Sequence, residues 1–199
     1  MSKKEGSKTI WIIIAVVLGI LIIVGLIFGY GCYYLYRVGT STNSPAPTAV
    51  NTEGWKYYNN ARYKFTLNYP NTFSDQESVN GDGVSLTSSS PAISVNAYGA
   101  TNSQNQSLDE YLNAARDDLF KGVEGAEEIA ATDTTLGGVS AQERKWQYVN
   151  SIDGTQTIMD QITALRGENF YTVQMVIAYS DYSEYAPMFD EILKSFKFV

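Results

Sequence analysis

Four side chains that carry oxygen ligands lie close together in one short segment. Asp75, Glu77, Asn80 and Asp82 fall within eight residues. Calcium takes about six to eight oxygen ligands, and closely spaced carboxylates can supply them. The segment lacks the spacing of an EF-hand loop and the glutamate of its last position. Because Asn-Gly and Asp-Gly pairs are typical of tight turns, we expect a turn here, with a calcium site as the alternative.

Three tyrosines recur near the end of the sequence, in the stretch YSDYSEY. They are Tyr179, Tyr182 and Tyr185, and we predict that they share one loop. Exposed tyrosines can anchor a protein or glycan partner, because their rings bury much area with little loss of conformational entropy. The alternative is that the rings cover the sheet edge and hold the last helix in place. Aromatic side chains are mostly buried, so we favour this second interpretation.

The composition removes most catalytic classes. There is no histidine, and the single cysteine is Cys32. Histidine is the usual acid–base group at neutral pH, and Cys32 falls in a long apolar run, so Ser-His-Asp and thiol chemistry are excluded. No Gly-rich phosphate loop is present. We predict no catalytic residue and no cofactor.

Paired carboxylates are the one catalytic alternative, because two of them can carry out glycoside hydrolysis. The acidic residues, however, gather in turns and on the polar face of one predicted helix, namely Asp109, Glu110, Asp117 and Asp118. A solvated helix face explains them. The function that we predict is therefore binding, and a carboxylate-dependent extracellular hydrolase is the alternative.

Charge is divided unevenly along the chain. Residues 1–9 carry a net charge of +2, whereas the segment from Thr40 onward contains ten Lys or Arg and twenty Asp or Glu, a net charge of −10. So acidic a domain repels polyanions. We therefore predict no nucleic-acid partner.

A long uncharged apolar run predicts one transmembrane helix at residues 9–36. A bilayer core needs about 20 helical residues, and the apolar stretch of a cleaved signal is only about 7–15 residues long. Three lysines precede the run and a single arginine, Arg37, follows it closely. The positive-inside rule therefore places residues 1–8 in the cytoplasm and the rest of the chain outside the cell membrane. The lipid bilayer is thus the first predicted partner.

Two other surface roles are possible for this N-terminal segment. A lipoprotein signal would acylate Cys32, but Gly29 and Tyr30 replace the leucine and the small residue that usually precede such a cysteine. A pilin-type leader would have a glutamate where Trp11 stands. Residues 37–54 are rich in Ser, Thr, Asn and Pro. They lack the apolar side chains that would offset ordering, so we predict a flexible linker.

The sequence of the domain at residues 55–199 predicts strands, a helix, strands and a helix, in that order. In YKFTLNYP, apolar side chains alternate from Tyr63 to Tyr69 and Pro70 ends the run, which indicates a half-buried core strand. Ser107 and Glu110 form a capping box at the start of an amphipathic helix at 107–122. A second helix is expected from about Ser183. The other expected strands are residues 55–58, 84–88, 92–99, 141–149, 156–165 and 169–179. This order predicts an α+β domain with an antiparallel sheet.

The domain resembles the PsbP-like domain family. The resemblance rests on WKYYNNARYKFTLNYPNTF, SLDEYL, GGVSAQERKWQY, RGENFYTVQM and FDEILKSFKF, and covers residues 55–199. It implies a central antiparallel sheet with helices on both faces. A role in photosystem II does not follow, because this chain lacks the histidines proposed for the photosystem member. Broader relatives bind protein partners, so the resemblance implies a binding platform for an unknown protein or glycan.

Overall fold

The computed structural model describes residues 50–121, 123 and 125–199. The described residues belong to one compact unit. Within the described residues there are two helices, α2 (Leu108–Leu119) and α3 (Tyr179–Ser195). The strands are β1 (Lys56–Asn60), β2 (Phe65–Tyr69), β3 (Ser74–Glu77), β4 (Gly83–Ser89), β5 (Ala92–Thr101), β6 (Glu127–Leu136), β7 (Val139–Val149), β8 (Gln156–Arg166), β9 (Asn169–Ala178) and β10 (Lys197–Phe198).

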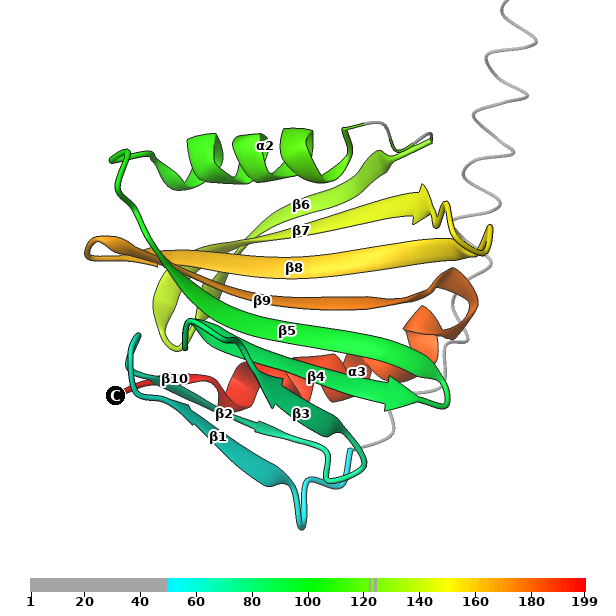
Figure 1. The fold of residues 1–199 in the computed structure, drawn as a ribbon, viewed down its shortest axis with the longest axis horizontal. Coiled ribbons are helices and arrows are strands. Elements are labelled where there is room, and N and C mark those ends of the chain that lie inside the picture. Colours follow the sequence, from blue (N-terminus) through cyan, green and yellow to red (C-terminus); the bar gives the residue numbers. More distant parts are fainter. Residues whose placement is uncertain (1–49, 122, 124) are drawn as a thin grey trace, which may run out of the picture. The chain divides into compact units, whose positions relative to one another are not determined.

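All strand pairs are antiparallel, and they form two sheets (Figure 1). The larger sheet has seven strands in the order β3-β4-β5-β9-β8-β7-β6. The smaller has three strands in the order β1-β2-β10, so the last strand pairs with one of the first. The antiparallel α+β architecture predicted from the sequence is confirmed.

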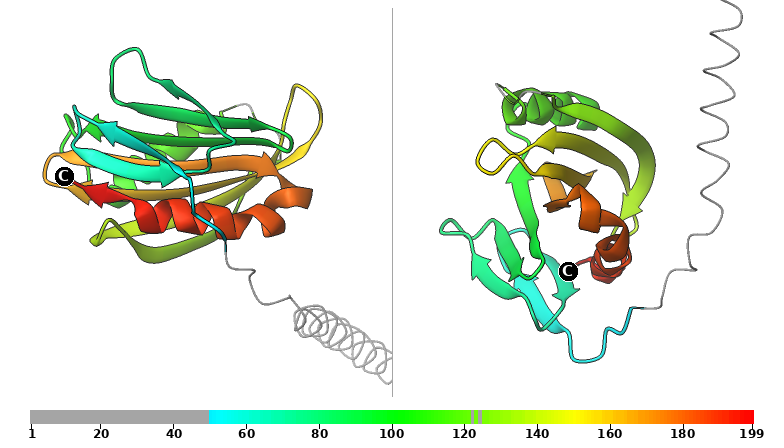
Figure 2. Two further views of the ribbon diagram at one scale, coloured as in Figure 1. Left: turned by 90° about the horizontal axis from the view of Figure 1, so that it is seen from below. Right: turned by 90° about the vertical axis from the view of Figure 1, so that its right-hand side faces the viewer.

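The main core lies between one face of the seven-stranded sheet and a layer made of α3 and the small sheet (Figure 2). Side chains alternate along β9, so that Tyr171, Val173 and Met175 point into this core. Phe189 and Ile192 of α3 are fully buried against them. We call this side of the large sheet its core face.

Helix α2 covers the opposite face of the same sheet. The Tyr111 ring stacks on Phe170 with 3.9 Å between ring centroids, and Phe170 is the neighbour of the core-facing Tyr171. The predicted capping box is present. Ser107 Oγ accepts from the Glu110 backbone N–H at 3.3 Å, and the Ser107 N–H donates to Glu110 Oε2 at 2.7 Å. The helices therefore lie on both faces, as the resemblance implied.

The core strand of the YKFTLNYP segment is confirmed, but it begins later than predicted. Phe65 and Leu67 have no exposed surface, and Phe65 stacks on Phe196 at 5.2 Å. The strand starts at Phe65 rather than Tyr63, because Lys64 adopts a left-handed conformation with φ of 56°. That conformation closes a turn in which the Lys64 N–H donates to the Asn60 carbonyl at 3.0 Å.

Three strands were not predicted, namely the two-residue β10 and the edge strands β3 and β6. Strand β3 occupies Ser74–Glu77, part of the segment expected to be an acidic turn. Strand β6 occupies Glu127–Leu136. Most of their side chains are exposed, because both strands lie at the edges of the large sheet. Edge strands with solvated side chains lack the alternation of apolar residues by which a strand is recognised.

The last helix starts earlier than expected, at Tyr179 rather than near Ser183. The tyrosine-rich stretch is therefore the first part of α3 and not a loop, which corrects the prediction. Pro187 falls inside the helix instead of its first turn. No helix among the described residues is long and apolar enough to cross a membrane. The predicted membrane segment, residues 9–36, lies outside the described part of the chain, as does Gly122.

Candidate functional site: a cleft beside the last helix

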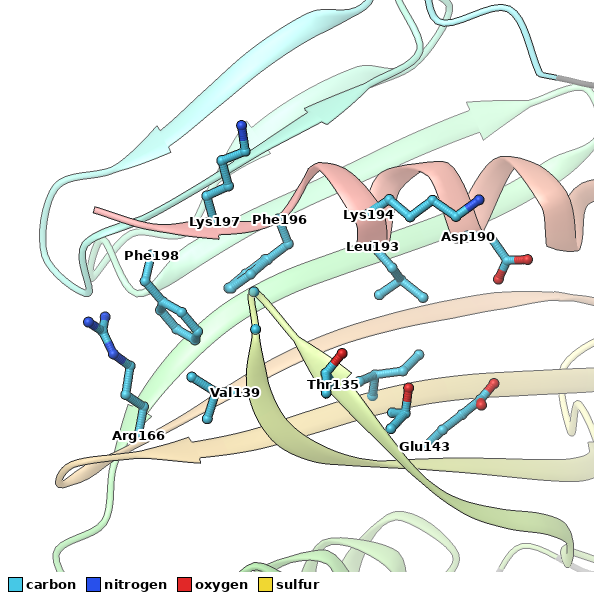
Figure 3. A pocket seen from close by; sticks show the side chains of 14 residues that line it. Thr135, Val139, Glu143, Arg166, Asp190, Leu193, Lys194, Phe196, Lys197 and Phe198 are labelled. Atoms are coloured by element: carbon cyan, nitrogen blue, oxygen red, sulfur yellow. The ribbon is translucent and has the colours of Figure 1, made fainter.

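A cleft of about 790 Å³ opens between the large sheet and the C-terminal half of α3 (Figure 3). Its lining comes from β6, the β6–β7 turn, β7, β8, α3 and β10. Helix α3 packs on β2, β8 and β9, and the cleft lies where residues of β6 and β7 face the end of this helix. Ligand pockets usually measure about 300–1,000 Å³ and combine an apolar lining with a few polar groups. This cleft falls within that range of volume, and seven of its fourteen lining residues are polar or charged.

One end of the cleft is cationic and aromatic. The Arg166 guanidinium carbon lies 4.5 Å above the centroid of the Phe198 ring. That ring is held edge-on by Phe196, with centroids 5.2 Å apart. The Lys197 side chain points away from the cleft (Figure 3). No acidic side chain in the described part of the chain forms an ion pair with Arg166. This end can therefore receive an anionic group.

The β6–β7 turn packs closely on this aromatic end (Figure 3). Gly137 and Gly138 both have positive φ, 57° and 81°, which is the conformation of a two-residue type I′ hairpin turn. A Cβ atom at Gly137 would lie 2.9 Å from the Phe198 ring. Glycine is thus needed at this position both for its backbone conformation and for the close approach.

The other end of the cleft is acidic, and Glu143 and Asp190 both line it. Glu143 Oε1 lies 2.7 Å from Lys145 Nζ, so this carboxylate is ion-paired. Burial raises the pKa of Asp190, and the nearby charge of Lys194 opposes that rise. The cleft therefore presents the Arg166 guanidinium near the turn and two carboxylates farther along α3, with Leu193 between the two ends. The ammonium groups of Lys145 and Lys194 lie beside these carboxylates.

A buried polar cluster lies beside the acidic end, and we call it the Lys145 cluster: Lys145, Asp160, Tyr182 and Glu143. Lys145 Nζ is 3.0 Å from Asp160 Oδ2 and donates to Tyr182 Oη at 2.7 Å. The Tyr182 hydroxyl in turn donates to Asp160 Oδ2 at 2.6 Å. The cluster ties α3 to strands β7 and β8.

The charges of the Lys145 cluster are set by burial and by these contacts. Burial alone would lower the pKa of Lys145, but hydrogen bonds to Glu143 and Tyr182 and the charge of Asp160 raise it above its usual value. Burial raises the pKa of Asp160, while its contacts with Tyr182 and Lys145 act in the opposite direction. Asp160 is only 3% exposed, and its Oδ1 has no hydrogen-bond partner among the described residues. We therefore regard Lys145 as charged and Asp160 as its counter-ion.

The four candidate calcium ligands lie elsewhere, near β3, and each has a protein partner. Asp75 Oδ1 is 3.4 Å from Lys56 Nζ, and Glu77 Oε1 accepts from the Tyr58 hydroxyl at 3.3 Å. Asn80 donates to Asp82 Oδ2 at 2.7 Å. Of these, Glu77 and Asp82 line a smaller cavity of about 380 Å³. The described residues contain no group of three or more acidic side chains that could hold a metal ion.

The three tyrosines of α3 have different environments. Tyr179 is 50% exposed. Tyr182 and Tyr185 are partly buried and pack against the core, and Tyr182 belongs to the Lys145 cluster. The interpretation that these rings hold the last helix therefore describes two of the three.

The residues of the cleft were not singled out from the sequence. Arg166 ends a strand, Phe198 belongs to the last strand, and Glu143 and Asp190 are separated by 47 positions. The one available signal was Asp160 inside QTIMDQITAL, where an acid interrupts an otherwise apolar strand. A buried carboxylate needs a partner, but the sequence does not reveal that Lys145 supplies it.

The described residues adopt a PsbP-like α+β fold. No family model matches the sequence, and no curated protein matches it. Among solved structures, cyanobacterial PsbP (CyanoP) from Synechocystis sp. PCC 6803 has a TM-score of 0.56 and 13% identity, covering 78% of this chain and 99% of that chain. The PsbP-like fold recognised from the sequence is thereby confirmed.

Two further solved structures share this fold. The Ran-binding protein Mog1p of Saccharomyces cerevisiae has a TM-score of 0.54 and 12% identity, covering 73% of this chain and 95% of that chain. LpqN of Mycobacterium tuberculosis, which is involved in cell envelope biogenesis, has a TM-score of 0.51 and 14% identity, covering 75% and 88%. At these identities the likeness concerns the fold alone.

Proposed function

We propose that this chain is a membrane-anchored, extracytoplasmic binding protein without catalytic activity, and that its partner occupies the cleft beside α3. The observation that carries the proposal is the cleft itself. It joins an unpaired cationic end, an apolar centre and an acidic end within one cavity of suitable volume. The Ran-binding role of Mog1p supports a protein partner, because there the same fold serves as a recognition domain.

The anchor is proposed from the uncharged run at residues 9–36 and the lysines before it. The name of LpqN, a protein of cell envelope biogenesis, supports a place outside the cytoplasm. Deleting residues 1–37 should release a soluble, folded, monomeric domain, because residues 63–196 supply the core of the described part of the chain. Aggregation of that fragment would contradict the anchor. So would the finding that the protein, expressed at full length, is cleaved and soluble outside the cell.

Site-specific photocrosslinking in intact membranes tests the proposed binding site. A photoreactive residue placed at Val139 or Leu193, inside the cleft, should capture a partner. The same residue at Asp118, on the exposed face of α2, is the matched control and should capture nothing comparable. Equal capture from both faces, or capture from α2 alone, would overturn the assignment of the cleft.

A carboxylate-dependent hydrolase is the second candidate, because Glu143 and Asp190 line the same cavity and the pKa of Asp190 is raised. A raised pKa suits a general acid. We favour binding, since the ion pair with Lys145 occupies the Glu143 carboxylate. Release of nitrophenol from nitrophenyl glycosides by the wild type, lost in both Glu143→Gln and Asp190→Asn, would favour the hydrolase instead.

A further inference from the structure

Strand β6 forms a free edge of the large sheet, and no strand of the described residues pairs with its outer side. Its register with β7 determines which backbone groups face outward. Leu136 and Val139 flank the two-residue turn and therefore form a hydrogen-bonded pair. Because bonding alternates along the strand, the N–H and C=O groups of Ala131, Asp133 and Thr135 point away from β7. All three residues are exposed.

This edge borders the cleft. Thr134 and Thr135 both line the cavity. Neighbouring residues of a strand point to opposite faces, so a cavity lined by both reaches the rim of β6. Leu193 and Lys194 of α3 line the cavity too. A strand added to β6 would thus place one row of its side chains toward the cleft.

The edge formed by residues 130–136 lacks the usual protection against pairing. Protected edges are short, or carry lysine, proline or a bulge. This segment has neither lysine nor proline, and its one charged residue is Asp133. The irregularity of the β6–β7 pairing lies outside it, between Glu128 and Ala130. The opposite edge of the sheet, β3, is only four residues long.

We infer that the partner is an extended polypeptide segment that adds to β6 as an antiparallel strand and fills the cleft with alternate side chains. This inference rests on the proposed binding function. Main-chain hydrogen bonds would supply affinity, and the cleft would select the side chains. Arg166 lies near the turn at the end of β6, whereas Glu143 and Asp190 lie farther from it. The added segment is therefore acidic near its start, aliphatic at alternate positions, and basic near its end.

Two model peptides of opposite polarity test the inference with the full chain in detergent micelles. Each peptide has about nine residues, a usual strand length, and blocked termini. One end carries glutamate and the other lysine, and valine and threonine alternate between them. With glutamate first, saturating peptide should slow hydrogen exchange of the amides of Ala131, Asp133 and Thr135 by about tenfold or more. With lysine first, binding should be at least several-fold weaker. Binding without protection of these amides, equal binding of both peptides, or no binding would overturn the inference.

A backbone variant provides the matched control. Asp133→Pro removes one outward N–H and leaves the bonds to β7 intact, since edge strands tolerate proline where the N–H faces solvent. It should weaken binding by about tenfold or more, whereas Asp133→Asn should change it less than about threefold. Equal effects of the two variants would refute strand addition.

Other occupants have distinct outcomes. If two copies of the chain pair through β6, the same amides would be protected from hydrogen exchange without peptide, and more so at higher protein concentration. A second copy would then take the place of the inferred partner. If photocrosslinks still form in the cleft while neither peptide binds, strand addition fails and the proposed binding site stands. If crosslinks are absent from the cleft as well, both fail.

Discussion

Asp160→Ala should be among the most destabilising substitutions in the domain. The Asp160 side chain is almost fully buried, lies 3.0 Å from Lys145 Nζ and accepts from the Tyr182 hydroxyl at 2.6 Å. Its removal leaves an ammonium without its buried counter-ion and a hydroxyl without its acceptor. Breaking such a pair typically costs about 3–5 kcal/mol. Lys145 keeps Glu143 at 2.7 Å and is itself 25% exposed at its side chain, so we expect about 2–4 kcal/mol.

Replacing both charged side chains should destabilise the domain less than Asp160→Ala alone. In Lys145→Met with Asp160→Leu, apolar side chains of similar size fill the same space, and the desolvation of two ions no longer has to be offset. The double variant leaves the Tyr182 hydroxyl without both of its partners, which costs about 1–3 kcal/mol. Its free energy of unfolding should therefore lie within about 2 kcal/mol of the wild type. Glu143 loses its ion pair in this variant, but it faces the cleft and can be solvated.

The measurement is urea denaturation of the full chain in micelles, monitored by tryptophan fluorescence. Of the three tryptophans, Trp146 is buried and next to Lys145 in sequence. The four proteins of a double-mutant cycle, with Met at 145 and Leu at 160, isolate the coupling energy of the pair. We expect a coupling of about 2–3 kcal/mol, with unchanged dependence on urea. Additive effects of the two single variants, or a loss below about 1 kcal/mol for Asp160→Ala, would refute the buried ion pair.

Three further substitutions test the core, the turn and the acidic segment. Phe65→Ala should cost about 3–5 kcal/mol in a denaturant titration, whereas the exposed neighbour Lys64→Ala should change almost nothing, and equal effects would contradict the core assignment. Gly137→Ala should lower the melting temperature more than Gly138→Ala, since both have positive φ but only Gly137 faces the Phe198 ring; identical shifts would mean that the turn does not pack there. Millimolar calcium should leave the melting temperature unchanged, and a rise of several degrees that Asp82→Asn abolishes would establish a calcium site.

The strands of the core could be predicted from the sequence because burial on one face leaves an alternating pattern. The capping box of α2 could be predicted too, because Ser107 and Glu110, which form its hydrogen bonds, are only three positions apart in the sequence. Strand β6 could not be predicted, because its stability comes from the ladder with β7 and its side chains are mostly in water. Backbone pairing with β7 does not require apolar side chains at alternate positions, so the sequence of β6 lacks the pattern that predicts a strand.

The start of α3 was missed for a related reason. Ala178 at its N-cap makes no side-chain hydrogen bond, so the usual Ser, Thr or Asp signal is missing. Tyr182 is instead fixed by Lys145 and Asp160, which lie far away in the sequence. The cleft, likewise, needs distant segments to meet, and only the tertiary structure brings Arg166 to Phe198.

The pairing of β10 with β2 has a consequence for the synthesis of this chain. Lys197 and Phe198 pair with Thr66 and Phe65, so the small sheet cannot be completed until more than 100 further residues have followed β2. At about 5–20 residues per second, the ribosome needs on the order of ten seconds to supply them. During that interval the nascent chain carries the aromatic surface of Phe65 without its Phe196 cover.

A nascent segment of this kind is a natural substrate for holdase chaperones. A polypeptide fused after Val199 would sit beside the same junction, because the Val199 N–H donates to the Lys64 carbonyl at 2.8 Å. A tag at that position is therefore expected to slow the pairing of β10 with β2 during folding. A tag placed before the apolar run should leave this pairing unchanged.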